Sequence, residues 1–424
     1  CIAGHHAGLP DWIGGDKPHG ALAYRLEKEK DVVAEPPVAG WIQRHQAEWM
    51  SRRLSAPWPM KSDASDVSFW IRMLFSCLVD ADFLDTEAFM DREKAGARQG
   101  YPKLSALAAR FFAQLDAMQR QAPATPVNRI RAEIRAACER MAPQVPGLFS
   151  LTVPTGGGKT LSGTAFALRH ALAHGHQRII YVIPYTSIIE QTADVLRGFL
   201  GADNVVEHHS SLDPDKETQQ SRLAAENWDA PVIITTSVQF FESLFSNRPS
   251  ACRKLHRLAR SVVLIDEVQT FPKELAIPTL ATLGHLAKQH CCTTVFATAT
   301  QPAFTHFDDH VKQIGGPGWQ PLEIVPPDLN LFDRARRTAV HWPQTDERTS
   351  WNELSEQLAR HNRVLCIVNL KRHAKRLIEL MKDRAGEAGL FHLSTNLCSA
   401  HREKILNDVR QRLADASAGP CRLI

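Results

Sequence analysis

Five short apolar runs, separated by segments of helical pattern, constrain the fold of this chain more than any other feature. The runs are rich in Val, Ile, Leu and Phe and span residues 148–153, 179–183, 232–235, 262–265 and 294–297. Their hydrophobicity is continuous rather than alternating, which is typical of strands buried on both faces. Because helical segments separate them, the runs predict a parallel sheet and an α/β domain after Gly147.

The part of the chain before residue 145 has a helical pattern instead. Apolar residues recur there at steps of three and four, at Phe69, Met73, Leu74, Cys77 and Leu78 and again at Leu104, Leu107, Phe111, Phe112 and Leu115. This spacing predicts two helices, each with one buried face. We expect a loop over residues 91–100 and a third helix over residues 128–141, which Pro143 ends.

The α/β pattern restarts towards the carboxyl end. Residues 315–331 carry several Gly and Pro residues and are predicted to form a linker. Beyond them, apolar runs at 340–342, 364–368 and 390–393, with a helix over 371–382, predict the opening half of a second α/β domain. We therefore divide the chain into residues 1–125, 126–325 and 326–424.

Composition excludes several classes of protein. No run approaches the ~18 apolar residues of a membrane span, and the nine cysteines include no CxxC pair of the kind found in zinc ribbons. Their spread favours reduced thiols in a cytoplasmic protein with no membrane partner. Lys and Arg number 50 against 46 for Asp and Glu, and this small excess indicates no partner by itself. The chain starts at Cys1 and stops at Ile424, and we expect both ends to be truncated.

The strongest local signal is PTGGGKT at residues 154–160, between an apolar run and a helix-compatible stretch. Consecutive glycines let several backbone N–H groups point at one phosphate, and the following helix adds its positive N-terminal end. In such a phosphate loop the Lys reaches the terminal phosphates and the Thr hydroxyl holds Mg²⁺. The predicted ATP-binding residues are Thr155, Gly156, Gly157, Gly158, Lys159 and Thr160. The pattern GxxxxGKT is incomplete, because Val153 occupies its first Gly position.

An acidic pair at the end of another apolar run completes such a site. The segment SVVLIDE, residues 261–267, ends in Asp266 and Glu267. A run that ends in Asp-Glu is common in itself, but strand ends in an open parallel sheet face one ligand crevice. We expect Asp266 to meet Mg²⁺ and Glu267 to polarise the attacking water. Lys159 and Glu267 are thus the predicted catalytic residues.

Three further segments stand in the order of the superfamily 2 helicase motifs. They are YVIPYTS at 181–187, ITTSVQ at 234–239 and TATQP at 298–302. Each alone says little, but together with the ATP motifs they resemble that superfamily, which often lacks the first Gly of the loop. Hydroxyl and amide groups can bond phosphates without reading sequence. The resemblance implies that Thr186, Thr236 and Gln239 contact single-stranded DNA.

Finer details resemble the CRISPR-associated helicase-nuclease of type I systems. They are LIDEVQTFP at 264–272, Val368-Asn369, and HLSTNLC at 392–398 with Arg402. Gln269, placed in the nucleotide site, stands where the family often has His and cannot ionise. The resemblance implies a RecA-like helicase lobe 1 at 126–325 and part of lobe 2 at 326–424. No QxxGRxxR pattern follows Cys398, so we expect this chain itself to hydrolyse ATP weakly or not at all.

The same resemblance makes residues 1–125 the back half of an α-helical HD nuclease domain with linker helices. Adjacent His5 and His6 can both reach a metal, although such pairs are more often surface residues. In the family, a His-His pair and a later Asp bind divalent transition-metal ions with upstream ligands. By position this role falls on His5, His6 and Asp82. Asp80 lies about 200° from Asp82 on a helix, so only one faces a given site. Because the upstream ligands are missing, we expect poor metal binding and little DNA cleavage.

The resemblance therefore implies an ATP-dependent single-stranded DNA translocase and helicase with a metal-dependent HD endonuclease. Such an enzyme degrades foreign DNA in CRISPR antiviral defence and is recruited by the surveillance complex with its guide RNA. Two alternatives stay open. One is a general superfamily 2 DNA or RNA helicase with an unrelated helical N-terminal region, which metal content distinguishes. The other is a nucleotide-gated binding module without unwinding, which strand displacement distinguishes.

Overall fold

The computed structural model describes residues 64–98, 100–210, 218–300, 304–343, 348–415 and 417–424, with the single residues 8, 24, 40 and 43. The chain divides into two compact units, Cys1–Arg336 and Arg337–Ile424. No helix in the described part of the chain is long and apolar enough to cross a membrane.

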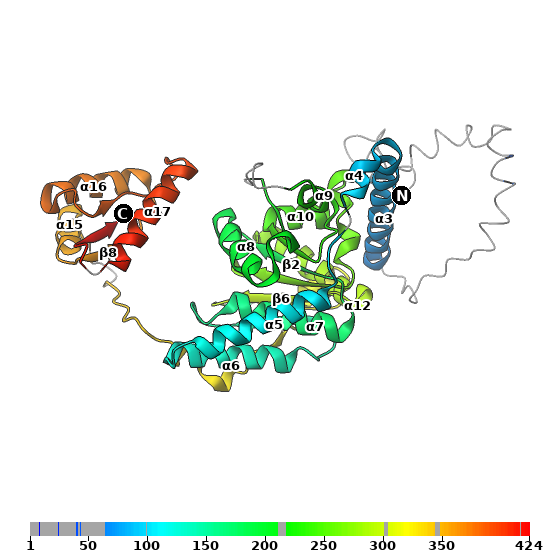
Figure 1. The fold of residues 1–424 in the computed structure, drawn as a ribbon, viewed down its shortest axis with the longest axis horizontal. Helices are drawn as coiled ribbons and strands as arrows, with labels where there is room; N and C mark the ends of the chain where they lie inside the picture. The colour runs from blue at the N-terminus through cyan, green and yellow to red at the C-terminus, as the bar shows by residue number, and fades with distance from the viewer. Residues whose placement is uncertain are drawn as a thin grey trace. The chain divides into compact units, whose positions relative to one another are not determined.

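A seven-stranded parallel sheet forms the centre of the first unit, as the apolar runs predicted (Figure 1). Its strands, in spatial order, are β3 (Val205–His208), β4 (Val232–Thr236), β2 (Arg178–Ile183), β5 (Ser261–Asp266), β6 (Thr293–Thr298), β1 (Leu148–Thr152) and β7 (Leu322–Glu323). Because every neighbouring pair is parallel, the carboxyl ends of the strands meet at one edge of the sheet. The loops that carry the predicted motifs leave from this edge.

Helices cover both faces of the sheet. One face packs against α5 (Leu104–Gln121), α6 (Pro126–Met141), α7 (Lys159–His174) and α8 (Thr186–Leu200). The other packs against α3 (Ala64–Met90), α9 (Gln219–Asn227), α10 (Ser237–Phe245), α12 (Lys273–His290) and α13 (Asp308–Gln313). Successive strand residues alternate between the two cores, so Tyr181 faces the first and Val182 the second. This double burial explains why the strands are continuously apolar.

Short helices and 3₁₀ turns make the remaining connections of the first unit. They are α4 (Arg92–Gly96), η3 (Ala202–Asn204), α11 (Pro249–Cys252), η5 (Leu255–Leu258), η6 (Val268–Thr270), η7 (Phe304–Phe307), η8 (Pro327–Leu329) and α14 (Leu331–Arg334). The prediction of a loop over 91–100 was wrong in part, because α4 forms there. Asp91 caps this helix by accepting a hydrogen bond from the Lys94 backbone N–H.

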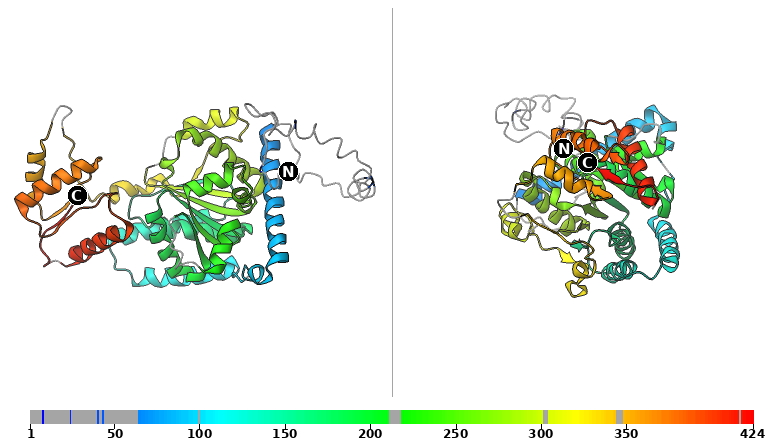
Figure 2. Two further views of the ribbon diagram at one scale, coloured as in Figure 1. Left: turned by 90° about the horizontal axis from the view of Figure 1, so that it is seen from above. Right: turned by 90° about the vertical axis from the view of Figure 1, so that its left-hand side faces the viewer.

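Helix α3 exists as predicted, but its buried face differs from the predicted one. Figure 2 shows this helix along the end of the first unit, where it contacts α11, α12 and η5. Phe69 and Met73 are buried, whereas Leu74 and Cys77 are exposed. The buried positions beyond Met73 are Phe75, Ser76, Val79 and Asp80. A polar residue at two of these positions hid the true face from a count of apolar spacing. The face predicted for α5 is confirmed, since the five apolar residues that predicted it are all buried.

The prediction of a linker over residues 315–331 was wrong. Trp319, Ile324, Val325 and Leu331 are buried in the first unit, and the segment adds β7 to the edge of the sheet. The ring of Trp319 lies 4.5 Å from the ring of Phe296 on β6. The Gly and Pro residues therefore lie at bends of a packed segment and do not form a linker.

The second unit holds a small parallel sheet, in the order β8 (Arg363–Leu365), β10 (Cys421–Leu423) and β9 (Leu390–Phe391). Its helices are α15 (Trp351–Ala359), α16 (Lys371–Ala385) and α17 (Ser399–Ala414). Helix α16 buries Ala374, Leu377 and Met381. The run at 340–342 was wrongly predicted as a strand, because it has no regular structure and its Trp342 is 86% exposed.

Candidate active site

The phosphate loop joins β1 to α7, and each of its glycines has a physical role. Gly156 and Gly158 adopt φ angles of +82° and +80°, which side-chain-bearing residues rarely adopt. A Cβ atom on Gly157 would lie 2.9 Å from the Pro154 carbonyl oxygen and 3.0 Å from the Ile134 side chain. Helix α7 begins at Lys159, so its unpaired N–H groups and the positive end of its dipole lie at the loop. The loop therefore has the shape of an anion-binding site.

The acidic pair meets the loop at the basic residue that ends it. Lys159 forms an ion pair with Asp266 Oδ1 and donates a hydrogen bond of 2.9 Å to Glu267 Oε1. Asp266 is the last residue of β5, and Glu267 follows it with a φ of +51°. This left-handed backbone is uncommon for a residue with a side chain and marks a turn that the surrounding structure holds in place. The three predicted residues thus converge on one point at the carboxyl edge of the sheet.

Charge at this point favours an ionised site. Burial opposes the charge on Lys159, but Asp266 and Glu267 outweigh it and raise its pKa. Burial also opposes ionisation of Glu267, but hydrogen bonds from Lys159 and Gln269 lower its pKa. Burial raises the pKa of Asp266, and the Lys159 ammonium opposes that increase. Both carboxylates lie against this one ammonium group, so Lys159 and the two acids form a charged cluster. Glu267 can therefore accept a proton or polarise a water near neutral pH.

Gln269 connects the acidic pair to the TAT segment after β6. Its amide nitrogen donates to Glu267 Oε2 at 2.5 Å, and its amide oxygen accepts from the Thr298 hydroxyl at 2.9 Å. The Thr298 hydroxyl in turn accepts from the Thr300 backbone N–H. A chain of polar contacts therefore runs from Lys159 to Thr300. The predicted placement of Gln269 in the nucleotide site stays a prediction, since its contacts here are with protein groups.

Helix α6 supplies residues that sequence analysis missed. Arg131 Nε donates a hydrogen bond of 3.0 Å to the Gly156 carbonyl, and Asn128 accepts one of 3.1 Å from the same guanidinium. These residues border a cavity of about 980 Å³ that also reaches Gly158 and Leu161. No short motif marks Arg131, because its contact depends on the packing of α6 against α7. The cavity adjoins the phosphate loop at Gly158.

Comparisons with known proteins agree with this geometry. The family model of the DEAD/DEAH box helicases matches residues 138–307. A CRISPR-associated nuclease/helicase Cas3 from Haloferax volcanii is 35% identical over 185 residues, which are 38% of this chain and 20% of that protein. Cas3 from Methanothermobacter thermautotrophicus is 24% identical over 301 residues, 64% of this chain and 33% of the relative. Over part of its length, this chain is similar in sequence to the Cas3 nuclease/helicases. The resemblance predicted from sequence is thereby confirmed.

Comparison with solved structures identifies a similar fold. The crystal structure of T. fusca Cas3 with AMPPNP has a TM-score of 0.61 to this chain at 15% identity, over 100% of this chain and 55% of that chain. Together with the DEAD/DEAH match, this confirms the predicted RecA-like α/β fold. The chain spans a third or less of the curated Cas3 relatives that it matches.

The residues predicted to contact DNA lie at or just after the carboxyl ends of the neighbouring strands β2 and β4. Thr186 begins α8 after β2, and Thr236 ends β4, which pairs with β2 so that Ile183 lies beside Thr236. Thr236 is only 7% exposed, and its hydroxyl caps α10 by accepting from the Gln239 backbone N–H at 3.1 Å. The Gln239 side chain is half-buried. A DNA contact at these positions stays a prediction.

Of the residues predicted to bind metal as in a nuclease/helicase, Asp82 alone lies in the described part of the chain. His5 and His6 lie outside the described residues. Asp82 is half-exposed on α3 and borders a cavity of about 920 Å³ that Lys94 and Arg222 also line. Within the described ranges, no group of three or more His, Cys, Asp or Glu residues could hold a metal ion.

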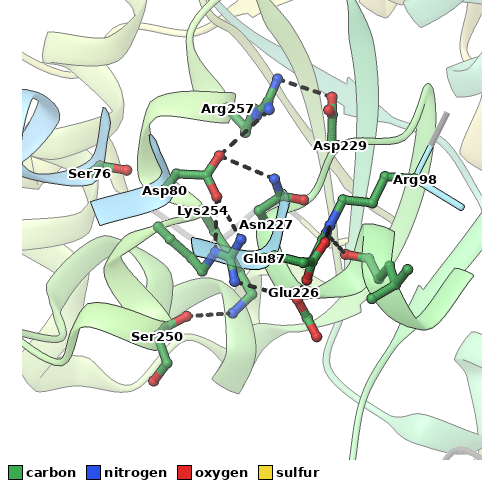
Figure 3. A network of polar contacts seen from close by, with 12 residues as sticks. Ser76, Asp80, Glu87, Arg98, Glu226, Asn227, Asp229, Ser250, Lys254 and Arg257 are labelled. Carbon is green, nitrogen blue, oxygen red and sulfur yellow. Dashed lines mark hydrogen bonds and ion pairs between the residues drawn. The ribbon is translucent and has the colours of Figure 1, made fainter. Parts of the chain in front are cut away.

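Its neighbour Asp80 has a different environment (Figure 3). Asp80 is 3% exposed, accepts a hydrogen bond of 2.9 Å from Arg253 Nε and one of 3.1 Å from Asn227 Nδ2. Arg257 lies 3.6 Å from its second oxygen. Partners elsewhere in the first unit thus satisfy the hydrogen bonds of this buried carboxylate, as a charge inside a protein requires. Asp80 therefore joins α3 to the ATP-binding unit rather than facing a site.

Proposed function

We propose that this chain is the ATP-binding part of a single-stranded DNA translocase and helicase. The observation that carries the proposal is the convergence of Lys159, Asp266 and Glu267 at a glycine loop that opens a helix. Lys159 begins α7, Asp266 ends β5 and Glu267 follows it, so separate elements bring one lysine and two adjacent carboxylates together. The homology to Cas3 helicases supports the same conclusion.

The residues fit a magnesium–nucleotide complex by their chemistry. The Thr160 hydroxyl and the Asp266 carboxylate would supply oxygen ligands of the kind that Mg²⁺ prefers. Mg²⁺ would neutralise negative charge on the phosphates. The loop N–H groups and Lys159 would bind phosphate oxygens, and Glu267 would orient the attacking water and take its proton. In the presence of nucleotide, Lys159 would exchange its carboxylate partners for phosphate oxygens.

Nucleic acid is proposed to cross the carboxyl edge of β2 and β4. Thr186 and Gln239 offer hydroxyl and amide groups there, and such groups hold a phosphate backbone without reading sequence. Gln269 and Thr298 connect the acidic pair to the end of β6 through one hydrogen-bonded chain. ATP turnover and strand movement are coupled through that chain.

The wider function follows from the family and is proposed for the protein as a whole. The resemblance of residues 1–125 to an HD domain supports a metal-dependent DNA endonuclease that uses His5, His6 and Asp82 with divalent transition-metal ions. We propose that the enzyme degrades foreign DNA in antiviral defence, in the cytoplasm, after recruitment by a CRISPR surveillance complex with its guide RNA. The separation into an HD part, lobe 1 and a partial lobe 2 is proposed on the same basis.

Binding of labelled single-stranded DNA tests the proposed motor. We expect fluorescence anisotropy to show DNA binding that changes with a non-hydrolysable ATP analogue and weakens as salt rises, because phosphate contacts release counterions. Combined T186A and Q239A changes weaken that binding, whereas a Val238→Ala change on the exposed side of α10 leaves it unaltered. A chain that binds no single-stranded DNA in any nucleotide state would contradict the proposal.

A further inference from the structure

The phosphate loop has two supports, and one segment outside the site contacts both. The first support is β1, which ends at Thr152, two residues before Pro154. The second is α6, whose Arg131 bonds the Gly156 carbonyl and whose Ile134 packs against Gly157. The segment Leu322–Arg334, called the strap below, contains β7 and α14 and leads towards the second unit.

Glu323 attaches the strap to β1. Its carboxylate accepts hydrogen bonds from the Ser150 hydroxyl at 2.8 Å, the Thr152 hydroxyl at 2.6 Å and the Thr152 backbone N–H at 3.0 Å. The next residue, Ile324, donates its N–H to the Ser150 carbonyl at 2.8 Å. Hydrogen bonds to an ionised acceptor are stronger than neutral ones and hold their partners in a defined geometry. Glu323 therefore fixes the last residue of the strand that enters the phosphate loop.

Arg334 attaches the other end of the strap to α6. Its guanidinium makes a bidentate pair with Glu133, with N–O distances of 2.6 and 2.8 Å. Glu133 lies two residues from Arg131 and next to Ile134, the two residues that touch the loop. Between the two attachments, Ile324, Val325 and Leu331 are buried in the core that β1 and α6 share.

We propose that the strap sets the affinity of the phosphate loop for nucleotide. Glu323 and Arg334 are positioning residues, because they hold β1 and α6 at the separation that shapes the loop while they contact no nucleotide themselves. Since binding linkage is reciprocal, nucleotide also tightens the strap. The strap runs directly into residues 337–424, so the chain that joins the two units passes through an element that senses nucleotide. The proposal rests on the proposed ATP site.

Nucleotide affinity of charge variants tests the strap. Titration of this chain with Mg²⁺ and a fluorescent ATP analogue is expected to give a Kd at least about fivefold higher for Glu323→Gln and for Arg334→Glu, the lower end of typical coupling effects. The double variant Glu133→Arg with Arg334→Glu restores the pair with reversed charges and is expected to recover affinity. Arg336→Glu is the matched control, because Arg336 is exposed and pairs only with Asp333 within the described residues.

Amide hydrogen exchange with and without nucleotide distinguishes the proposed coupling from a purely structural role, which would not make exchange in the strap depend on nucleotide. We expect saturating nucleotide to slow exchange of the Ile324 and Val325 amides in the wild-type chain and not in Arg334→Glu. If Glu323→Gln fails to fold, the exposed Glu133–Arg334 pair still decides the matter. Wild-type binding with unchanged Kd in every variant would overturn the strap while leaving the ATP site in place. A wild-type chain that binds no nucleotide would overturn both.

Discussion

The buried side chain of His170 leads us to predict that the first unit loses stability in mildly acidic solution. This side chain lies on α7, is fully buried, and stacks on Phe166 with ring centroids 5.2 Å apart. Its Nδ1 lies 2.8 Å from the Ala142 carbonyl oxygen and its Nε2 lies 2.7 Å from the Thr293 hydroxyl. Since a carbonyl can only accept, Nδ1 carries a proton. Burial disfavours a second proton on the ring, so the native ring is neutral and Nε2 accepts from the Thr293 hydroxyl.

The magnitude follows from the pKa of this group. Burial, with smaller contributions from His176 and His174, lowers the pKa of His170 from 6.5 to about 4. An unfolded chain takes up the proton near pH 6.5, but the folded chain does so only near pH 4. Stability is thus fully present above pH 6.5 and is lost as pH falls towards 4. Between pH 7 and pH 5 the loss from this one residue is about 2 kcal/mol.

Urea unfolding of the wild-type chain and of His170→Asn at both pH values measures this effect. Comparison of the two proteins cancels the titration of other buried histidines. We expect the variant to lose about 2 kcal/mol less than the wild type on acidification, whereas His310→Asn, at an exposed position of the same unit, loses as much as the wild type. Equal losses in wild type and His170→Asn would refute the assignment of a neutral buried ring.

Two other substitutions follow from single contacts. Asp80→Ala leaves Arg253 buried without its main partner and is expected to destabilise the first unit by about 3–5 kcal/mol in thermal or urea unfolding. Asp82→Ala, at a half-exposed position two residues further along α3, is expected to change the free energy of unfolding little. Similar losses for both variants would show that Asp80 is not the anchor of α3. Gly157→Ala adds a Cβ atom 2.9 Å from the Pro154 carbonyl oxygen, so the affinity for nucleotide is expected to fall at least about tenfold. Circular dichroism is expected to show that β1 and α7 stay folded. Unaltered binding would show that the loop can move aside.

The features that sequence could predict are those whose causes are local. The phosphate loop is contiguous, and its glycines are required by φ angles and one close contact within the loop region. The five central strands are recognisable because burial on both faces makes them apolar throughout. Strand β3 was missed because it is short and carries Glu207, whose partners Arg197 and His209 are needed before a carboxylate can be buried there.

The features that sequence could not predict depend on partners far along the chain. Asp80 is a core position only because Arg253, 173 residues away, supplies the opposite charge. Residues 315–331 have the composition of a linker, but Trp319 and Ile324 are buried against a sheet whose strands come from earlier in the chain. Glu323 and Arg131 carry no motif, since their importance comes from what they touch. The metal ligands predicted at His5 and His6 remain a sequence-based prediction.

Nucleotide binding by the wild-type chain and by single and double variants of the ion pair tests the central claim most directly. Isothermal titration with ATP and Mg²⁺ is expected to give one site per chain in the wild type and much weaker but measurable binding in Lys159→Ala. In Asp266→Asn, binding is expected to depend much less on Mg²⁺. The double variant should bind no worse than Lys159→Ala, because both residues act on the same complex. Equal affinity in wild type and Lys159→Ala would contradict the claim that the glycine loop and the acidic pair form one ATP site.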